Sequence, residues 1–75
     1  MNKKRRKQLT SVVSTLQKCS DDLETIRNDE DETRENVPEN LQSSDRYLES
    51  EDCSDVLSGA IDNINEAIGE LENIA

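Results

Sequence analysis

Two runs of apolar residues, each spaced alternately by three and four positions, constrain the fold of this 75-residue chain most strongly. The first run consists of Leu9, Val12, Leu16, Cys19, Leu23 and Ile26. The second consists of Cys53, Leu57, Ala60, Ile64, Ala67, Leu71 and Ile74. This alternation is the heptad pattern, which places apolar side chains on one side of a helix that packs against another helix.

The segment between the two runs predicts a turn. It contains Pro38, which cannot continue a helix, and the whole chain has only two Gly, one Pro and one aromatic residue, too few for a sheet with several turns. We therefore expect an all-α antiparallel hairpin resembling a coiled coil, with helices at about 3–33 and 44–74 and a turn at about 34–43. Asn2 and either Ser43 or Ser44 are suitable N-caps.

Within the turn, we expect Pro38 to open a single helical turn, and Val37 and Leu41 to fold over the open end of the core. The predicted core or oligomer seam consists of Leu9, Val12, Leu16, Leu23, Ile26, Leu57, Ile61, Ile64, Ile68 and Leu71. Ile61 and Ile68 flank the main run of the second helix and widen its apolar side. Because two helices alone bury little surface, we expect a homodimeric four-helix bundle with twofold symmetry, or a docked partner protein.

Charge is distributed very unevenly along the chain. Residues 1–18 carry six basic and no acidic side chains, whereas residues 19–75 carry three basic and 18 acidic ones, which gives the net charge of −9. In the hairpin, the cations at 3–7 should lie near Glu66, Glu70 and Glu72 at the end of the second helix. Contact with nucleic acid or with an anionic membrane surface is the alternative for these cations, although no aromatic residue accompanies them.

The acidic residues gather toward the predicted turn. Those that we take as candidate partner-binding residues are Asp21, Asp22, Glu24, Asp29, Glu30, Asp31, Glu32, Glu49, Glu51 and Asp52. Such a surface attracts a basic surface of a partner, for example the nucleic-acid groove of a host enzyme, which the protein would occupy as a charge mimic. The alternative interpretation is that these charges serve only solubility.

No catalytic or cofactor-binding pattern is found. The chain has no His, and its Ser and Thr residues have no activating base beside them in the sequence. Cys19 and Cys53 fall in the apolar runs, so we expect reduced, buried thiols at similar heights in the core rather than a redox pair or a zinc site. Residues 29–40 faintly resemble a calcium loop, but Arg34 stands where the loop requires Gly. We therefore expect no enzymatic activity, no metal and no cofactor.

The location of the protein follows from two further features. No stretch approaches the 18 apolar residues of a membrane span. The basic opening resembles that of a signal peptide, but residues 8–15 are too polar to form its apolar part. We expect a cytoplasmic protein.

Asn36–Tyr47, which includes the sequence Pro-Glu-Asn-Leu-Gln, and Ala60–Ile68, which begins Ala-Ile-Asp-Asn-Ile, resemble segments of small acidic helical proteins of phages and prophages of Gram-positive and gut bacteria. No activity is established for such proteins, so the resemblance transfers no functional residue. It implies a bacterial host and a phage-encoded inhibitor that binds a host protein, including a component of antiviral defence. The alternatives are a structural or assembly protein without a host target, and a nucleic-acid accessory protein that uses Lys3–Lys7.

Overall fold

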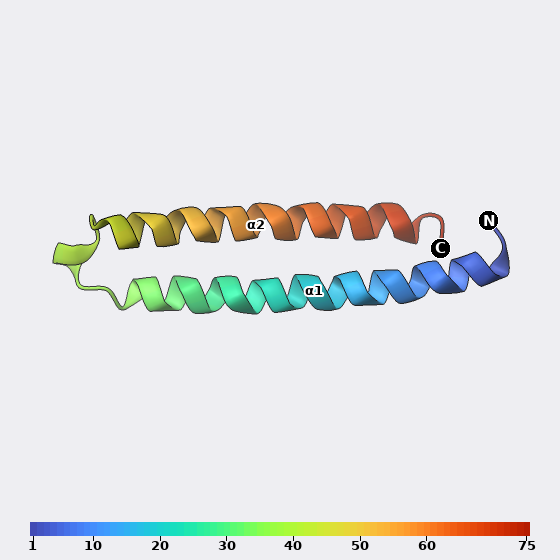
Figure 1. Cartoon of the computed structure of the whole chain (residues 1–75), viewed down its shortest axis with the longest axis horizontal. Coiled ribbons are helices and arrows are strands. Elements are labelled where there is room, and N and C mark those ends of the chain that lie inside the picture. Colours follow the sequence, from blue (N-terminus) through green and yellow to red (C-terminus); the bar gives the residue numbers. More distant parts are fainter.

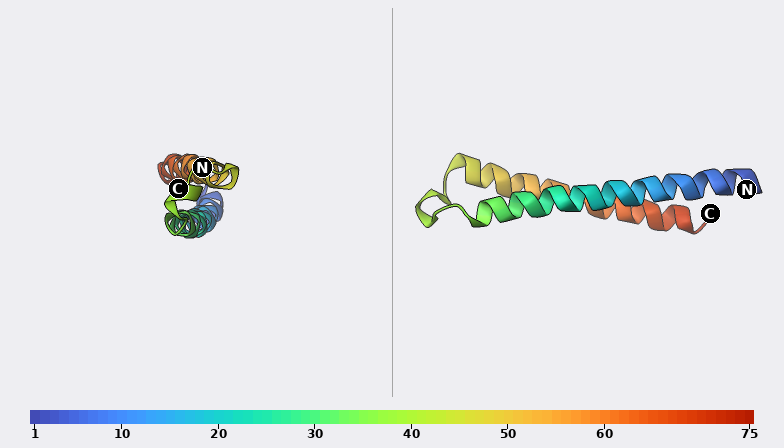
Figure 2. Two further views of the ribbon diagram at one scale, coloured as in Figure 1. Left: turned by 90° about the vertical axis from the view of Figure 1, so that its left-hand side faces the viewer. Right: turned by 90° about the horizontal axis from the view of Figure 1, so that it is seen from below.

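The computed structural model describes residues 1–75 and is a single hairpin of two long helices (Figure 1). Helix α1 spans Lys3–Glu35, a short 3-10 turn η1 spans Glu39–Leu41, and helix α2 spans Asp45–Glu72. The two helices run antiparallel and side by side, and the molecule measures 59 × 14 × 13 Å. The end-on view in Figure 2 shows the two helices alone, without a further layer. The all-α hairpin expected from the heptad pattern is confirmed.

Both long helices begin at residues whose side chains complete the first turn. Asn2 Oδ1 accepts a hydrogen bond from the backbone N–H of Arg5 at 2.8 Å, and Ser44 Oγ accepts one from the N–H of Tyr47 at 3.2 Å. These bonds satisfy N–H groups that have no partner within the helix. α1 is two residues longer than expected, and α2 begins one residue later and ends two residues earlier.

The chain reverses direction between Glu35 and Asp45 through a short connection that contains η1. Pro38 stands directly before η1 with φ of −57°, and its carbonyl accepts a hydrogen bond from Leu41 N at 2.9 Å, so the single helical turn opened by Pro38 is present. Val37 is half-buried, whereas Leu41 remains 50% exposed. The expectation that both cover the end of the core is wrong for Leu41, because η1 protrudes beyond the ends of both helices (Figure 1).

The interior of the hairpin is a seam that, up to Leu71, keeps every second position of the two apolar runs and replaces each of the others by the residue that follows it. Its buried and half-buried side chains again alternate in steps of three and four. Along α1 the seam consists of Leu9, Val13, Leu16, Ser20, Leu23 and Arg27, and along α2 it consists of Ser54, Leu57, Ile61, Ile64, Ile68 and Leu71; other half-buried side chains of both helices border it. Leu9, Leu16, Leu23, Leu57, Ile64 and Leu71 of the expected seam therefore contribute to the interior, each half-buried.

Two residues of the expected seam lie outside the hairpin interior. Val12 is 51% exposed and Ile26 is 54% exposed, because the seam uses Val13 and the position after Ile26 instead. Conversely, Ile61 and Ile68, expected beside the main run, are two of the three buried apolar residues, and Ile61 is only 2% exposed. The hairpin turns the α1 side that carries Val13 and Ser20 toward these two large side chains.

The five cations of residues 3–7 do not meet the carboxylates of α2. The structure contains two ion pairs, Lys18–Asp22 at 2.9 Å and Arg34–Asp31 at 2.7 Å. α1 has 33 residues and α2 has 28, so the N-terminal turns of α1 extend past the end of α2 (Figure 1). The expected pairing with Glu66, Glu70 and Glu72 is therefore wrong, because the overhang carries the cations beyond them.

Candidate interaction surfaces

One edge of the hairpin carries the hydrogen bonds that join the two helices. Ser20 Oγ donates to Asn65 Oδ1 at 2.9 Å, and Ser54 Oγ donates to Asp31 Oδ1 at 2.6 Å. Near the open end, Gln17 Nε2 donates to Glu72 Oε1 at 3.4 Å. We call the edge defined by these three pairs the polar edge. Both serines are buried, and no buried side-chain N or O atom lacks a partner.

Arg34 continues the seam of α1 where apolar side chains end. Its guanidinium donates to Ser54 Oγ at 2.9 Å and to Ser50 Oγ at 3.1 Å through Nη1, and to Asp31 Oδ1 at 2.7 Å through Nη2. The half of the hairpin next to the turn is thus joined by a polar network instead of an apolar core. Polar networks of this kind hold a register only when every member is satisfied, as it is here.

Sequence reasoning missed this network. The signal that could have found it is the seven-residue spacing: Ser20, Arg27 and Arg34 continue the series that begins at Val13, and Ser54 precedes Ile61 by seven residues. A search for apolar residues alone passes over these seam positions because their side chains are polar.

The network shifts the titration of two of its members. The hydroxyl of Ser54 and then the guanidinium of Arg34 donate to the Asp31 carboxylate and hold its pKa below its ordinary value. The hydrogen bond to Asp31 in turn raises the pKa of Arg34. Asp31, one of the candidate partner-binding residues, therefore also belongs to the hydrogen-bond network that joins the two helices.

We expect Asp31→Asn to lower the melting temperature at neutral pH, because it removes the charge that accepts both hydrogen bonds. A depressed folded-state pKa stabilises the hairpin fully above the unfolded-state pKa of about 4, and this stabilisation disappears as pH falls through the folded value. The difference in melting temperature between parent and variant, followed by circular dichroism, should therefore shrink below about pH 4.

Asp29→Asn is the matched control for this experiment. Asp29 lies in the same part of α1, is exposed, and its side chain makes no hydrogen bond or ion pair. It should leave the melting temperature almost unchanged. Equal effects of the two substitutions at every pH would contradict the role of the network.

Seven of the ten candidate acidic residues lie on both helices in the half of the hairpin next to the turn, residues 27–57, which we call the turn half; Asp21, Asp22 and Glu24 precede it in α1. Eight of the ten are exposed, and the two half-buried ones are Glu30 and Asp31. Only Asp22 and Asp31 are engaged in ion pairs. Residues 27–57 carry 11 acidic and three basic side chains, a net charge of −8. The hairpin thus concentrates most of the net charge of the molecule at the end with the turn, distributed around it rather than on one face.

The two cysteines lie neither in the core nor close together. Both thiols are free and exposed. The cross-helix hydrogen bonds set a register in which the numbers of facing residues add to 85, so Cys53 faces the level of residue 32 of α1. Cys19 is 13 residues away from that level, roughly 20 Å along the axis. The expectation of buried thiols at similar heights is wrong because both precede a seam position by one residue.

The second face of the hairpin is apolar and only half covered. We call it the open face, and it consists of Leu9, Val12, Leu16, Cys19, Leu23 and Ile26 of α1 with Cys53, Val56, Leu57, Ala60, Ile64, Ala67 and Leu71 of α2 and Ile74 just after the end of α2. All of these side chains are half-buried or exposed. With Val56 added, they are the two apolar runs that dominate the sequence.

Both helices present this face on the same side, opposite the polar edge. Cys19 follows Gln17 by two residues, and Ala67 follows Asn65 by two residues. Two residues along an α-helix turn the side chain by about 200°. Because Gln17 and Asn65 both make cross-helix bonds on the polar edge, Cys19 and Ala67 lie together on the other side.

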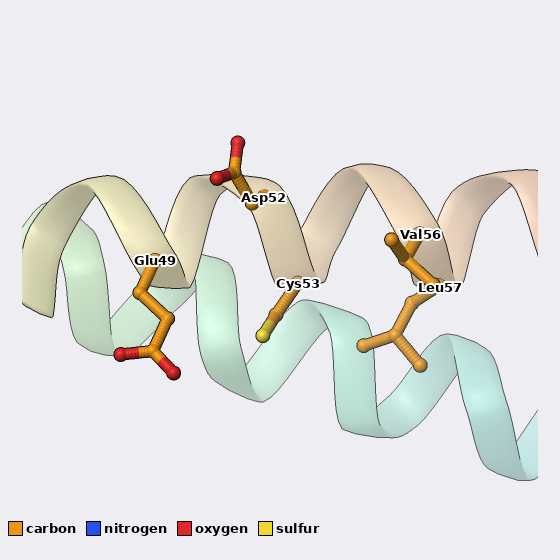
Figure 3. A pocket seen from close by; sticks show the side chains of 5 residues that line it. All are labelled: Glu49, Asp52, Cys53, Val56 and Leu57. Carbon is orange, nitrogen blue, oxygen red and sulfur yellow. The ribbon is translucent and has the colours of Figure 1, made fainter.

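Near the turn, the open face contains an open pocket on α2 (Figure 3). It is lined by Glu49, Asp52, Cys53, Val56 and Leu57. Figure 3 shows Glu49, Cys53 and Leu57 on the side of α2 toward α1, whereas Asp52 points away from α1. Val56 is 72% exposed, so the apolar surface here is bordered by carboxylates and has no cover within the chain.

No helix of the protein combines the length and the apolar character that crossing a bilayer requires. No three Cys, Asp or Glu side chains are grouped so that they could hold a metal ion. In comparisons with known proteins, no family model, no curated protein and no solved structure matches this chain. The structure thus offers three candidate interaction surfaces: the acidic turn half, the cations of residues 3–7 where α1 extends past α2, which we call the basic overhang, and the open face.

Proposed function

We propose that this chain is a non-enzymatic binding protein whose acidic turn half docks on a basic surface of a host protein. In the phage context that the sequence resemblance implies, it acts in the bacterial cytoplasm as an inhibitor, including of a defence protein. The observation that carries this proposal is the net charge of −8 on residues 27–57, which the hairpin folds into one end of the molecule.

The spacing of these charges favours a partner whose basic surface normally binds nucleic acid. In the turn half, α1 from Arg27 to Glu35 and α2 from Asp45 to Leu57 extend over roughly 12 and 18 Å of helix axis, so the net charges are spaced by about 2 Å along the hairpin. Double-stranded DNA carries one phosphate charge per 1.7 Å or so of axis, and each of its strands one per 3.4 Å or so. A groove lined with Lys and Arg for a phosphate backbone would therefore attract this end of the hairpin at a comparable charge spacing.

The carboxylates are also available. Of the candidate residues, Asp21, Glu24, Asp29, Glu30, Glu32, Glu49, Glu51 and Asp52 make no ion pair within the chain. Because these side chains make no ion pair, they add no ion-pair energy to folding, and exposed pairs would in any case add little. A basic partner would relieve the repulsion among them, and complementary charge acts mainly on the rate and specificity of association.

The test is an affinity capture from a bacterial host lysate, read by mass spectrometry at low and at high salt. The variant Asp29→Lys, Glu32→Lys and Asp52→Lys reverses three exposed charges in the turn half. We expect it to lose the captured partner, and we expect the parent protein to lose it steeply as salt rises. Asp31 is left unchanged because it belongs to the polar network.

A matched variant reverses three exposed charges far from the turn, at Asp62, Glu66 and Glu70. It changes the net charge by the same amount and should retain the partner. A capture that is insensitive to salt and to both variants would contradict the proposal.

The open face favours a second candidate function, that of a structural or assembly protein without a host target. Its 14 half-buried or exposed residues form a continuous apolar surface suited to another helical element. This candidate would be favoured if substitutions on the open face abolished every captured interaction while both charge-reversal variants bound like the parent protein.

A further inference from the structure

The hairpin exposes more surface than a compact protein of its size. Its accessible surface is 5801 Å², whereas a compact folded chain of 8.5 kDa exposes about 4,650 Å². The excess of about 1,150 Å² is larger than the roughly 800 Å² that each partner contributes to a stable interface of standard size. Only three apolar residues are buried, Val13, Ile61 and Ile68. The hairpin therefore exposes enough surface for a stable interface, and burial of further apolar side chains in such an interface would stabilise it.

The open face has the extent to supply this burial. In the register set by the cross-helix hydrogen bonds, its residues extend from the level of Leu9 to that of Cys53, which faces residue 32. This is about 23 residues, roughly 35 Å of helix axis. Within this length its seam-side members recur every seven residues, as Leu9, Leu16 and Leu23 do in α1, which is the pattern that interlocks with a second helical pair.

Charge selects both the occupant and its orientation. One end of the hairpin carries five unpaired cations on the overhang of α1, and the other end carries the net charge of −8. A second copy placed antiparallel brings each cationic overhang to an acidic turn half. A parallel copy would instead place cations against cations and carboxylates against carboxylates. At about 10 Å spacing such charges still interact at moderate ionic strength.

We propose that two copies of this chain pack their open faces together in an antiparallel, twofold-symmetric four-helix bundle. Alignment of the two open faces about their midpoint, near the level of residue 21, carries Lys3–Lys7 to the level of Glu35, Glu39 and Glu49 of the second copy. This inference does not rest on the proposed binding of a basic host protein, because the surface that is packed is the open face. The two proposals meet at the acidic turn half, which faces the cationic overhang of the second copy in the bundle.

The native cysteines report on this arrangement. In an antiparallel pair, Cys19 lies two residues from the midpoint, so the two Cys19 side chains are offset by about 6 Å along the axis. Cys53 lies 11 residues from the midpoint, so the two Cys53 side chains are roughly 33 Å apart. In a parallel pair, each cysteine lies at the same height as its counterpart in the second copy. The axial offset is then zero for both Cys19 and Cys53, so it does not favour cross-linking of one over the other.

The experiment compares Cys53→Ser, which retains Cys19, with Cys19→Ser, which retains Cys53, each treated with a short bismaleimide at micromolar protein concentration. Both cysteines are exposed in the hairpin, so neither replacement disturbs its interior. We expect Cys53→Ser to give at least ten times more cross-linked dimer than Cys19→Ser. Similar yields from both variants would overturn the antiparallel arrangement.

Sedimentation of the parent protein under reducing conditions tests the assembly itself. We expect a species of twice the chain mass, and a folded monomer at this concentration would overturn the proposal. Ile26→Asp, on the open face, should raise the dimer dissociation constant at least tenfold. Thr25→Asp is the control, because this exposed neighbour faces away from the open face and should leave assembly unchanged.

Discussion

Ile61→Asp should abolish the folded hairpin, with loss of most of the helical circular dichroism at 25 °C. Ile61 is the most buried residue of the protein, with 2% of its surface exposed. An aspartate there loses the apolar contacts of the isoleucine, worth about 2–5 kcal/mol in truncations of this kind, and adds the cost of burying an unpaired charge. A chain of this length has about 4–11 kcal/mol of stability in total, so these losses consume most or all of it.

Leu48→Asp provides the control for this prediction. Leu48 is an apolar residue of the same helix, but it is 49% exposed and lies in the first turn, where an acidic side chain suits the helix dipole. The control should keep its helical signal and melt near the parent temperature. If Ile61→Asp stayed folded, or if both variants unfolded, the seam described here would be wrong.

Gly59→Ala together with Gly69→Ala should stabilise the protein considerably. Both glycines are in the interior of α2, and a methyl group added at either position meets no atom within 4 Å. Alanine is favoured over glycine inside a helix by about 1 kcal/mol, because it reduces the freedom of the unfolded chain. For a chain of this size the two changes should raise the melting temperature by roughly 8–15 °C, measured at fixed protein concentration.

The two single substitutions test the reasoning behind this increase. They lie ten residues apart along α2, about 15 Å, so their effects should add. Neither glycine belongs to the open face or the polar edge, so sedimentation should be unchanged. A melting temperature that does not rise would contradict the open surroundings that the structure gives to both positions.

The helical hairpin could be predicted from sequence because heptad spacing and the single proline act locally. Steps of three and four place side chains on one side of a helix whatever the helix later contacts. Pro38 ends α1 for covalent reasons, and Asn2 and Ser44 cap the helices through bonds to residues three positions away.

The choice of seam could not be predicted in the same way. Leu16 and Leu23 border both the interior and the open face, so they fit either seam equally well. The apolar runs pointed to the side with Val12 and Ile26, because Ser20 and Arg34 interrupt the other side with polar groups. Only the packed hairpin shows that those polar groups find partners across the interface, at Asn65 and Ser54 for example.

The acidic surface could be predicted from the sequence only in part, because the contacts of each carboxylate depend on how the two helices face each other. Its charge and its gathering toward the turn follow from composition and chain reversal. That Asp31 is held by Ser54 and Arg34, while Glu32 beside it remains unpaired, depends on which helix side faces the partner helix.

By itself, the sequence determined two helices, their reversal at Pro38, the unequal distribution of charge and the apolar runs, because each depends on neighbours a few residues away. The tertiary structure alone decided which run lies inside, which carboxylate is bound and how far the cations of α1 extend past α2. These depend on the rotation and the offset of one helix against the other, which many side chains across the interface set together.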